Sequence, residues 1–146
     1  MKYATESLAQ VMDEIKTLSE LHYGEVAEDK DSIPLSVDWG HYAGMERNQA
    51  LRIYTARVDG ALVGYNVFVL LYHPRYKTTL FAQNDVIFVH PEHRGRRGEF
   101  IDFADEQLKA DGVVKATYHV KIKHDWSPMI VGKGYSPQDI VLTKVL

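Results

Sequence analysis

The residues best suited to chemistry lie where an apolar segment meets a basic, glycine-containing turn. Residues 86–89 are all apolar, residues 90–97 carry three arginines, two histidines and one glycine, and residues 98–110 have the apolar spacing of an amphipathic helix. The start of a helix leaves backbone N–H groups without intrahelical partners, glycine lets the chain approach a phosphate closely, and arginine adds positive charge. The pattern therefore predicts an anion site, and a pyrophosphate is the guest that it fits best.

The composition is that of a water-soluble globular protein. Of the 146 residues, 45% are hydrophobic and 25% are charged, and no uninterrupted apolar run reaches the length of a membrane span. We expect one domain, residues 1–146, with a core large enough to fold without disulfides or structural metal. The chain has no cysteine, which excludes thiolate zinc sites and cysteine nucleophiles, and its first residues lack the apolar core of a signal peptide. We therefore expect a cytoplasmic protein without a membrane partner.

The distribution of charge argues against nucleic acid as a partner. The formal net charge is −3 at pH 7, whereas broad binding to nucleic acid needs a summed positive field or an extended basic stripe. Arg94, Arg96 and Arg97 instead form a compact basic patch, which suits one small polyanion. The lysines that alternate along residues 115–123 fit the solvated face of a strand.

Two helices are expected before the first long strands. Apolar residues recur at helical spacing over residues 7–23, and Ser7 with Gln10 makes a capping-box start. Residues 24–35 are polar and predict a loop, after which residues 36–49 have a weaker helical pattern.

The rest of the chain predicts strands and two further helices. Asp59-Gly60 lies between two β-rich runs and accepts the positive φ values of a tight hairpin turn, and Asp111-Gly112 is a stop for the helix over residues 98–110. A short helix is expected over residues 127–133. The predicted strands are residues 51–58, 61–71, 78–89, 113–122 and 140–145.

This order of elements predicts an α+β, or mixed α/β, fold. The helix over residues 98–110 is a crossover connection, so the strands on either side of it, 78–89 and 113–122, should lie parallel in one sheet with a right-handed connection.

Three local patterns give the chain a specific resemblance to the GNAT superfamily of N-acetyltransferases. The strand and turn of residues 86–99 resemble the coenzyme A site of the family. Arg94 matches the first position of the family's glycine turn, although Arg97 and Glu99 stand where the family has small residues. Gly134-Tyr135 resembles the glycine-aromatic pair before the last strand of the family. Segments such as residues 120–125 are also similar to small members encoded by bacteriophages, whose location would be the host cytoplasm.

The resemblance implies the architecture of the site. It implies a twisted mixed sheet of about six strands, with helices on both faces and a V-shaped splay between the two central parallel strands. It also implies a bulge in strand 78–89. Backbone groups of this strand would pair with the pantetheine arm of acetyl-CoA, since a splayed strand leaves N–H and C=O groups that need a partner. The implied acetyl-CoA residues are Ile87, Phe88, Val89, Arg94, Gly95, Arg96, Arg97, Gly98 and Glu99.

Acyl transfer from a thioester to an amine needs a neutral amine, a polarised carbonyl and a proton for the departing thiolate. Family members often carry an acidic residue four positions before the valine that precedes the turn, and here that residue is Asp85. It would take the amine proton directly or through a water. The alternative is a polar patch over residues 83–85 that binds substrate or caps backbone groups without proton transfer.

The proton donor of the family is absent. A tyrosine stands four residues before the glycine-aromatic pair in many relatives, but here that residue is Ile130. His124 occupies the place of the family's helix-starting asparagine and is a candidate because an imidazole can carry and release a proton, and Tyr118 is a second candidate. The alternatives are packing, capping by Asp125, or direct attack with solvent taking the proton. His90 and His93 have no third ligand at a suitable spacing, so we expect no metal site.

Two hypotheses of function follow. The first is an acetyl-CoA-dependent N-acetyltransferase that acts on a primary amine, of a small molecule or a protein, by direct transfer in a ternary complex. The second is a GNAT-fold binding or effector protein that engages a partner protein with little or no catalysis, which the missing tyrosine and the altered glycine turn favour. The acceptor is not encoded in a recognisable motif, and a homodimer is an arrangement that the sequence leaves open.

Overall fold

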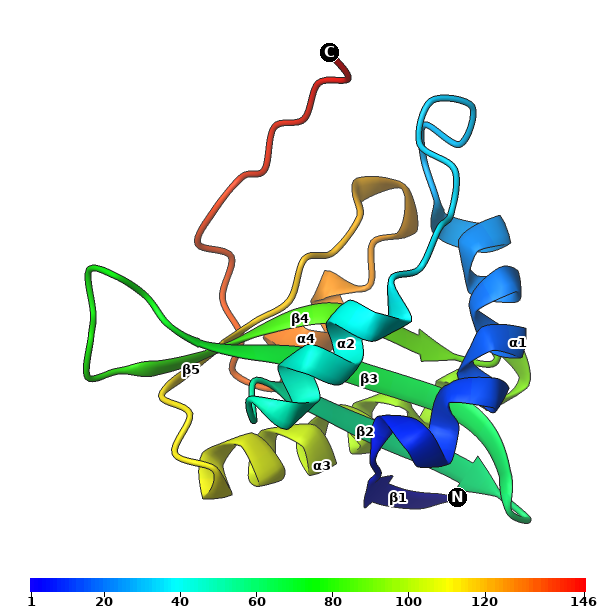
Figure 1. The fold of residues 1–146 in the computed structure, drawn as a ribbon, viewed down its shortest axis with the longest axis horizontal. Helices are drawn as coiled ribbons and strands as arrows, with labels where there is room; N and C mark the ends of the chain where they lie inside the picture. The colour runs from blue at the N-terminus through cyan, green and yellow to red at the C-terminus, as the bar shows by residue number, and fades with distance from the viewer.

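A computed structural model describes residues 1–146. The chain forms a five-stranded mixed sheet with helices packed on both faces (Figure 1). The elements are β1 (Lys2–Thr5), α1 (Leu8–Val26), α2 (Trp39–Arg47), β2 (Leu51–Val58), β3 (Ala61–Tyr72), β4 (Leu80–Val89), the 3₁₀ turn η1 (Pro91–Arg96), α3 (Arg97–Ala110), β5 (Lys115–Thr117), the 3₁₀ turn η2 (Ile122–His124) and α4 (Ser127–Val131).

The sheet follows the order of the sequence, from β1 to β5. The first four strands pair antiparallel, and β5 returns parallel to β4 after the crossover helix α3. The α+β fold and the parallel pair are therefore confirmed. The hairpin between β2 and β3 is also confirmed, since Asp59 has φ 49° and Gly60 has φ 86°, the positive pair that a tight type I′ turn requires.

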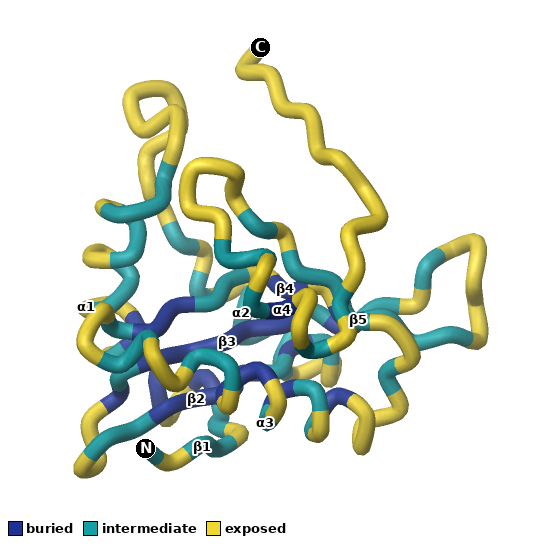
Figure 2. The backbone as a smooth tube through the Cα atoms, turned by 180° about the vertical axis from the view of Figure 1, so that it is seen from behind, coloured by how far each residue is buried: buried dark blue, intermediate teal, exposed yellow.

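The core consists of two layers, one on each face of the sheet. On one face, α1 and α2 pack over β2, β3 and the end of β4, around Val11, Ile53 and Phe88. On the other face, α3 packs through Phe100, Ala104 and Leu108 against residues of the same strands. The central strands are the most buried part of the chain (Figure 2). No helix combines the length and the apolar character needed to cross a membrane.

The sheet differs from the expected one at its two edges. β1, which sequence patterning missed, is only four residues long and is recognisable through its pairing with β2 and the stacking of Tyr3 on Phe100 (ring centroids 5.3 Å apart). The strand predicted over residues 113–122 is formed only at Lys115–Thr117, and residues 140–145 form no strand. The sheet thus has five strands rather than about six, because a β-rich segment becomes a strand only where a neighbour pairs with its backbone.

Candidate functional site

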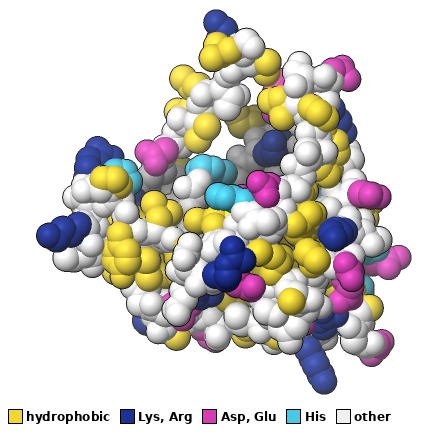
Figure 3. Space-filling view, viewed as in Figure 1, with side chains coloured by type: hydrophobic (Ala, Val, Ile, Leu, Met, Phe, Trp, Pro, Cys, Tyr) yellow, Lys and Arg dark blue, Asp and Glu magenta, His cyan; other side chains and the backbone are white.

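A cavity of about 700 Å³ opens beside the second half of β4. Its floor is β3 and β4, and its walls are α1, the loop into α2, and residues 119–126, which follow β5. Figure 3 shows the hollow on the face seen in Figure 1, with histidine side chains at its rim. The cavity follows from the sheet, because β4 pairs with β5 only from Phe81 to Gln83. Beyond Gln83, the edge of β4 has no strand beside it.

A β-bulge places Asp85 at this cavity. Val86 pairs with Val67 and Asn84 pairs with Phe68, so Asp85 is the extra residue in the ladder between β3 and β4. The implied bulge in this strand is therefore confirmed. A bulge redirects side chains and interrupts the ladder, which is how an exposed carboxylate comes to lie next to the buried Asn84.

The side chain of Asn84 stabilises the bulge through hydrogen bonds. Its side-chain amide lies 3.0 Å from the carbonyl of Val67, 3.2 Å from the carbonyl of Val86, and 2.8 Å from the Oδ1 atom of Asn66. The amide of Asn66 in turn donates to the hydroxyl of Tyr118, at 2.8 Å. This chain of buried polar groups ties the bulge in β4 to the end of β5.

The carboxylate of Asp85 has one protein partner. The hydroxyl of Tyr42, on α2, donates to its Oδ2 atom at 2.5 Å. Burial and the hydrogen bond to Asp85 raise the pKa of Tyr42 well above its ordinary value, so the tyrosine keeps its proton and acts as a donor. Asp85 therefore has a fixed orientation and a second oxygen that can face a substrate.

The basic turn puts two arginines at the far end of the cavity and one outside it. Arg94 donates to the carbonyl of Val89 at 3.0 Å and to the carboxylate of Glu25 at 2.5 Å. Arg96 pairs with Glu99 on the outer surface, and neither residue lines the cavity.

Arg97 is a half-buried cation of the cavity that has no carboxylate partner. It makes no hydrogen bond or ion pair with the protein, and its guanidinium lies 5.5 Å from the ring centre of Trp126. Burial and the nearby Arg94 lower the pKa of Arg97 from its ordinary value, but a guanidinium stays charged at neutral pH. A half-buried cation without a carboxylate is a ready partner for an anion.

Neither glycine of the turn lines the cavity. Gly95 lies in open space within η1, and a Cβ atom at Gly98 would come within 2.9 Å of the side chain of Lys133. Gly98 thus lets Lys133 cross the first turn of α3 and reach Asp102, at 2.6 Å. At this end of the cavity the basic turn therefore contributes arginine side chains and not its glycines.

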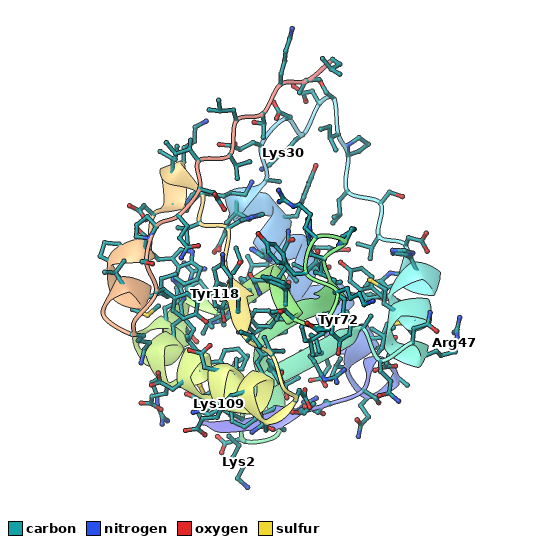
Figure 4. All side chains as sticks on the ribbon, turned by 90° about the vertical axis from the view of Figure 1, so that its left-hand side faces the viewer. Lys2, Lys30, Arg47, Tyr72, Lys109 and Tyr118 are labelled. Carbon is teal, nitrogen blue, oxygen red and sulfur yellow. The ribbon has the colours of Figure 1, made fainter.

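The structure separates the two candidate proton donors. His124 ends η2 and lines the same cavity as Asp85. Tyr118 lies in the body of the molecule, whereas Lys2, Lys30 and Arg47 project from the surface (Figure 4). Tyr118 lines a neighbouring groove and not the cavity. Burial raises the pKa of Tyr118. Asp125 accepts a hydrogen bond from the backbone of Ser127 at 2.8 Å, which is the capping role considered for it.

Sequence reasoning missed His22 as a cavity residue. His22 contributes to the apolar stripe of α1, but its ring lies 5.1 Å from that of Phe88 and its Nδ1 atom lies 3.3 Å from the hydroxyl of Tyr65. The only signal in the sequence was a histidine within an apolar stripe, and that pattern is equally typical of packing.

The pKa of His22 predicts a pH-dependent stability. Burial lowers this pKa, Glu25 opposes the shift, and Arg94 and Lys121 add to it. The unfolded chain, with a histidine pKa of about 6.5, therefore takes up a proton first as the pH falls. The contribution of His22 to stability is present above about pH 6.5 and is lost as the pH falls towards the folded pKa, with a slope of at most about 1.4 kcal/mol per pH unit.

Urea unfolding of the wild type and of His22→Gln between pH 7.5 and 5 would measure this contribution. We expect a flatter pH dependence in His22→Gln, whereas His41→Gln, at an exposed histidine of α2, should follow the wild type. Equal slopes in all three proteins would contradict the prediction.

The fold of the chain is similar to the folds of several solved structures. The chain is similar to a ribosomal-protein-alanine N-acetyltransferase from Brucella melitensis biovar Abortus 2308, with a TM-score of 0.69, 20% identity, and coverage of 100% of this chain and 99% of that chain. It is similar to an aminoglycoside acetyltransferase from an uncultured soil metagenomic sample, in complex with sisomicin, with a TM-score of 0.74, 12% identity, and coverage of 99% and 95%.

A predicted acetyltransferase from Clostridium acetobutylicum with acetyl-CoA matches with a TM-score of 0.73, 13% identity, and coverage of 99% and 95%. No protein-family model and no curated protein sequence matches the chain. At these identities the likeness establishes the fold, which is that of the GNAT acetyltransferases, as the sequence predicted. Because the matches span nearly the whole chain, they include β4, the basic turn and α3.

Proposed function

We propose that this protein is an acetyl-CoA-dependent N-acetyltransferase that transfers an acetyl group to a primary amine by direct transfer in a ternary complex. One observation carries the proposal. The edge of β4 has no strand beside it from the Asp85 bulge onward, and it leads directly to the two arginines of the cavity. The carboxylate of Asp85 at one end would face the thioester of an acyl-CoA, and the two arginines at the other end would face its pyrophosphate.

The distance along β4 between Asp85 and the arginines supports this placement of acetyl-CoA. Val89 lies four positions after Asp85, a rise of roughly 13 Å along a strand, and Arg94 donates a hydrogen bond to the carbonyl of Val89. Backbone groups of Ile87, Phe88 and Val89 would pair with the amides of the pantetheine arm. Arg97, with Arg94 behind it, would bind the pyrophosphate through its guanidinium group.

Acetyl-CoA supplies the activated acetyl thioester, and the residues of the cavity would manage the protons. Asp85, oriented by Tyr42, would accept the proton of the attacking amine directly or through a water. His124, on the wall formed by residues 119–126, would protonate the departing thiolate. Tyr118 lies outside the cavity, so we propose that it acts as a positioning residue, through Asn66 and Asn84, and that it transfers no proton itself.

The acceptor would enter beside α2. Leu35, Val37, Trp39 and Tyr42 line that side of the cavity, which offers apolar and aromatic surface around a single carboxylate. A small molecule or a protein side chain with one primary amine would fit this environment. We retain a cytoplasmic location, a likeness to bacteriophage-encoded members, and a homodimer as proposals from the sequence.

Substituting Arg97 should test the cosubstrate site directly. Loss of a charge-assisted contact costs about 1.5–3 kcal/mol, so Arg97→Gln should weaken the binding of acetyl-CoA by roughly 10- to 150-fold. Isothermal titration calorimetry would measure the dissociation constants. The matched control is Arg96→Gln, because Arg96 is paired with Glu99 outside the cavity, and its dissociation constant should stay near that of the wild type.

Equal losses in the two variants would contradict the assignment of Arg97, and absence of binding by the folded wild type would reject the acetyl-CoA site. The alternative function, a binding or effector protein, is favoured by the buried Ile130 at the position of the family's tyrosine. Tight binding of acetyl-CoA without turnover on any amine of a broad acceptor panel would select that alternative.

A further inference from the structure

The carboxylates of the cavity limit the positive charge that an acceptor can bring. Three carboxylates line the cavity, those of Glu25, Asp85 and Asp125. Glu25 is paired with Arg94, and Asp125 accepts a hydrogen bond from the backbone at the start of α4. Asp85 has neither a cation nor a backbone N–H as its partner, since it is bonded to the hydroxyl of Tyr42. The cavity therefore has one carboxylate available for one ammonium group.

The other charged groups around the cavity are positive. Arg97 and Lys121 line it, together with three histidines, which are either neutral or positive. Beside α2, the ammonium group of Lys16 lies 5.4 Å from the ring centre of Trp39, which lines the cavity. The acidic neighbour of Lys16 is Asp13, which is 3.9 Å away and almost fully exposed. A second ammonium group on the acceptor would therefore meet like charge and no available carboxylate, which is unfavourable in a partly buried site.

The side of the cavity beside α2 is otherwise apolar. Leu35, Val37 and Trp39 line it from the loop and from α2, and the buried side chains of Ile53 and Tyr65 line it from the sheet. Leu35 is 46% exposed although it lines the cavity. An apolar group that extended from Asp85 along this side would remove such surface from water, which is favourable in proportion to the area covered.

We propose that the acceptor is a primary monoamine with an apolar body, aliphatic or aromatic, and that the cavity rejects amines with a second positive charge. This inference rests on the proposed acetyl transfer and specifies its acceptor. The nitrogen would lie at Asp85, and the apolar body would lie against Leu35 and Trp39. Leu35 and Lys16 are then specificity-determining residues, because Leu35 favours an apolar body and Lys16 repels a second ammonium group.

The transfer step is the same for every acceptor of this class. The lone pair of the neutral amine forms a bond to the carbonyl carbon of the thioester, and the C–S bond breaks with its electron pair on sulfur. The nitrogen loses one proton towards Asp85, and the thiolate gains one proton. The products are an N-substituted acetamide and coenzyme A, and no further reactant is needed.

Two amines of equal length test the proposed class. n-Hexylamine and 1,6-diaminohexane share the same carbon chain and differ by the second ammonium group. The kcat/KM of the wild type should be at least about 10-fold higher for hexylamine, because an unpaired charge is disfavoured where a methyl group is favoured. Calorimetry in the presence of coenzyme A should give the same preference as a ratio of dissociation constants. Equal values for the two amines, or a preference for the diamine, would overturn the proposal.

Substitutions at the apolar side should change this preference. Leu35→Asp should reverse it, because the new carboxylate can pair with a second ammonium group, and circular dichroism should find the fold intact since Leu35 is exposed. The matched control is Ile33→Asp, in the same loop, 59% exposed and outside the cavity, which should keep the preference of the wild type. The same preference in Leu35→Asp as in the wild type, or an equal change in Ile33→Asp, would contradict the assigned role of Leu35.

Lys16→Gln should narrow the gap between the two amines by making the diamine a better ligand. Lys109→Gln removes the same charge from an exposed position of α3, on the other face of the sheet, and should leave the gap unchanged. Equal effects of the two substitutions would mean that the net charge of the protein, and not the position of Lys16, opposes the diamine.

Binding and turnover separate this inference from the proposed function. A folded wild type that binds hexylamine in preference to the diamine but acetylates neither would reject the transfer and retain the assigned class of amine. A wild type that acetylates both amines equally well would retain the transfer and reject the class.

Discussion

Replacement of Asp85 by asparagine is expected to lower kcat for acetyl transfer by about 10²- to 10⁴-fold, the range in which a positioned acid or base contributes. Asparagine keeps the size of the side chain and can still accept from Tyr42, but it cannot take a proton from an amine. The affinity for acetyl-CoA should change little, because the arginines at the far end of the cavity are untouched. Single-turnover kinetics with an accepted amine, together with calorimetry, would separate the two effects.

The control for Asp85 is another exposed carboxylate near the site. Glu92 lies in η1, outside the cavity, and Glu92→Gln should retain the kcat of the wild type. If Asp85→Asn also retains that kcat, the carboxylate serves binding or backbone capping, as the alternative interpretation of residues 83–85 holds. A common loss in both variants would point to a general effect of charge.

The second large effect concerns stability. Asn84→Leu should lower the free energy of unfolding by about 3 kcal/mol or more, because the three acceptors that share the two amide hydrogens of Asn84 lose their donor while the leucine supplies none. The three acceptors are the carbonyls of Val67 and Val86 and the side-chain oxygen of Asn66. Urea unfolding should report a lower midpoint with an unchanged m-value.

Gln83→Leu provides the comparison, since Gln83 precedes Asn84 on β4 and is exposed. Substitutions on the surface change stability by about 0.5 kcal/mol or less, so this variant should match the wild type closely. Equal stability of Asn84→Leu and Gln83→Leu would mean that the bulge does not depend on the amide of Asn84.

The sequence predicted those parts of the fold that local patterns determine. Asp59-Gly60 specifies its hairpin through positive φ values, and the apolar spacing of α3 specifies a crossover helix and with it a parallel strand pair. The resemblance added the bulge, which the register of Val67 and Phe68 confirms. These features depend on residues near one another in the chain.

The remaining features depend on contacts between distant residues, and no local pattern encodes them. Tyr42 meets Asp85 across 43 positions, and His22 meets Tyr65 across 43 positions. The placement of Arg97 over Trp126 depends on how α4 packs beside α3. The predictions for the two edges of the sheet were wrong for the same reason, because the length of a strand such as β5 depends on how far a neighbouring strand pairs with it.

The chain has two tryptophans, Trp39 and Trp126, and both line the cavity. Trp39 lies on α2, on the side where the acceptor would enter, and Trp126 lies beneath Arg97, at the end proposed for the pyrophosphate. The protein therefore carries its own optical reporter at each end of the cavity. In Trp39→Phe, quenching of the fluorescence of the remaining Trp126 would report binding of the cosubstrate. In Trp126→Phe, quenching of the fluorescence of the remaining Trp39 would report binding of the amine. The order in which the two ligands bind can therefore be followed without a label.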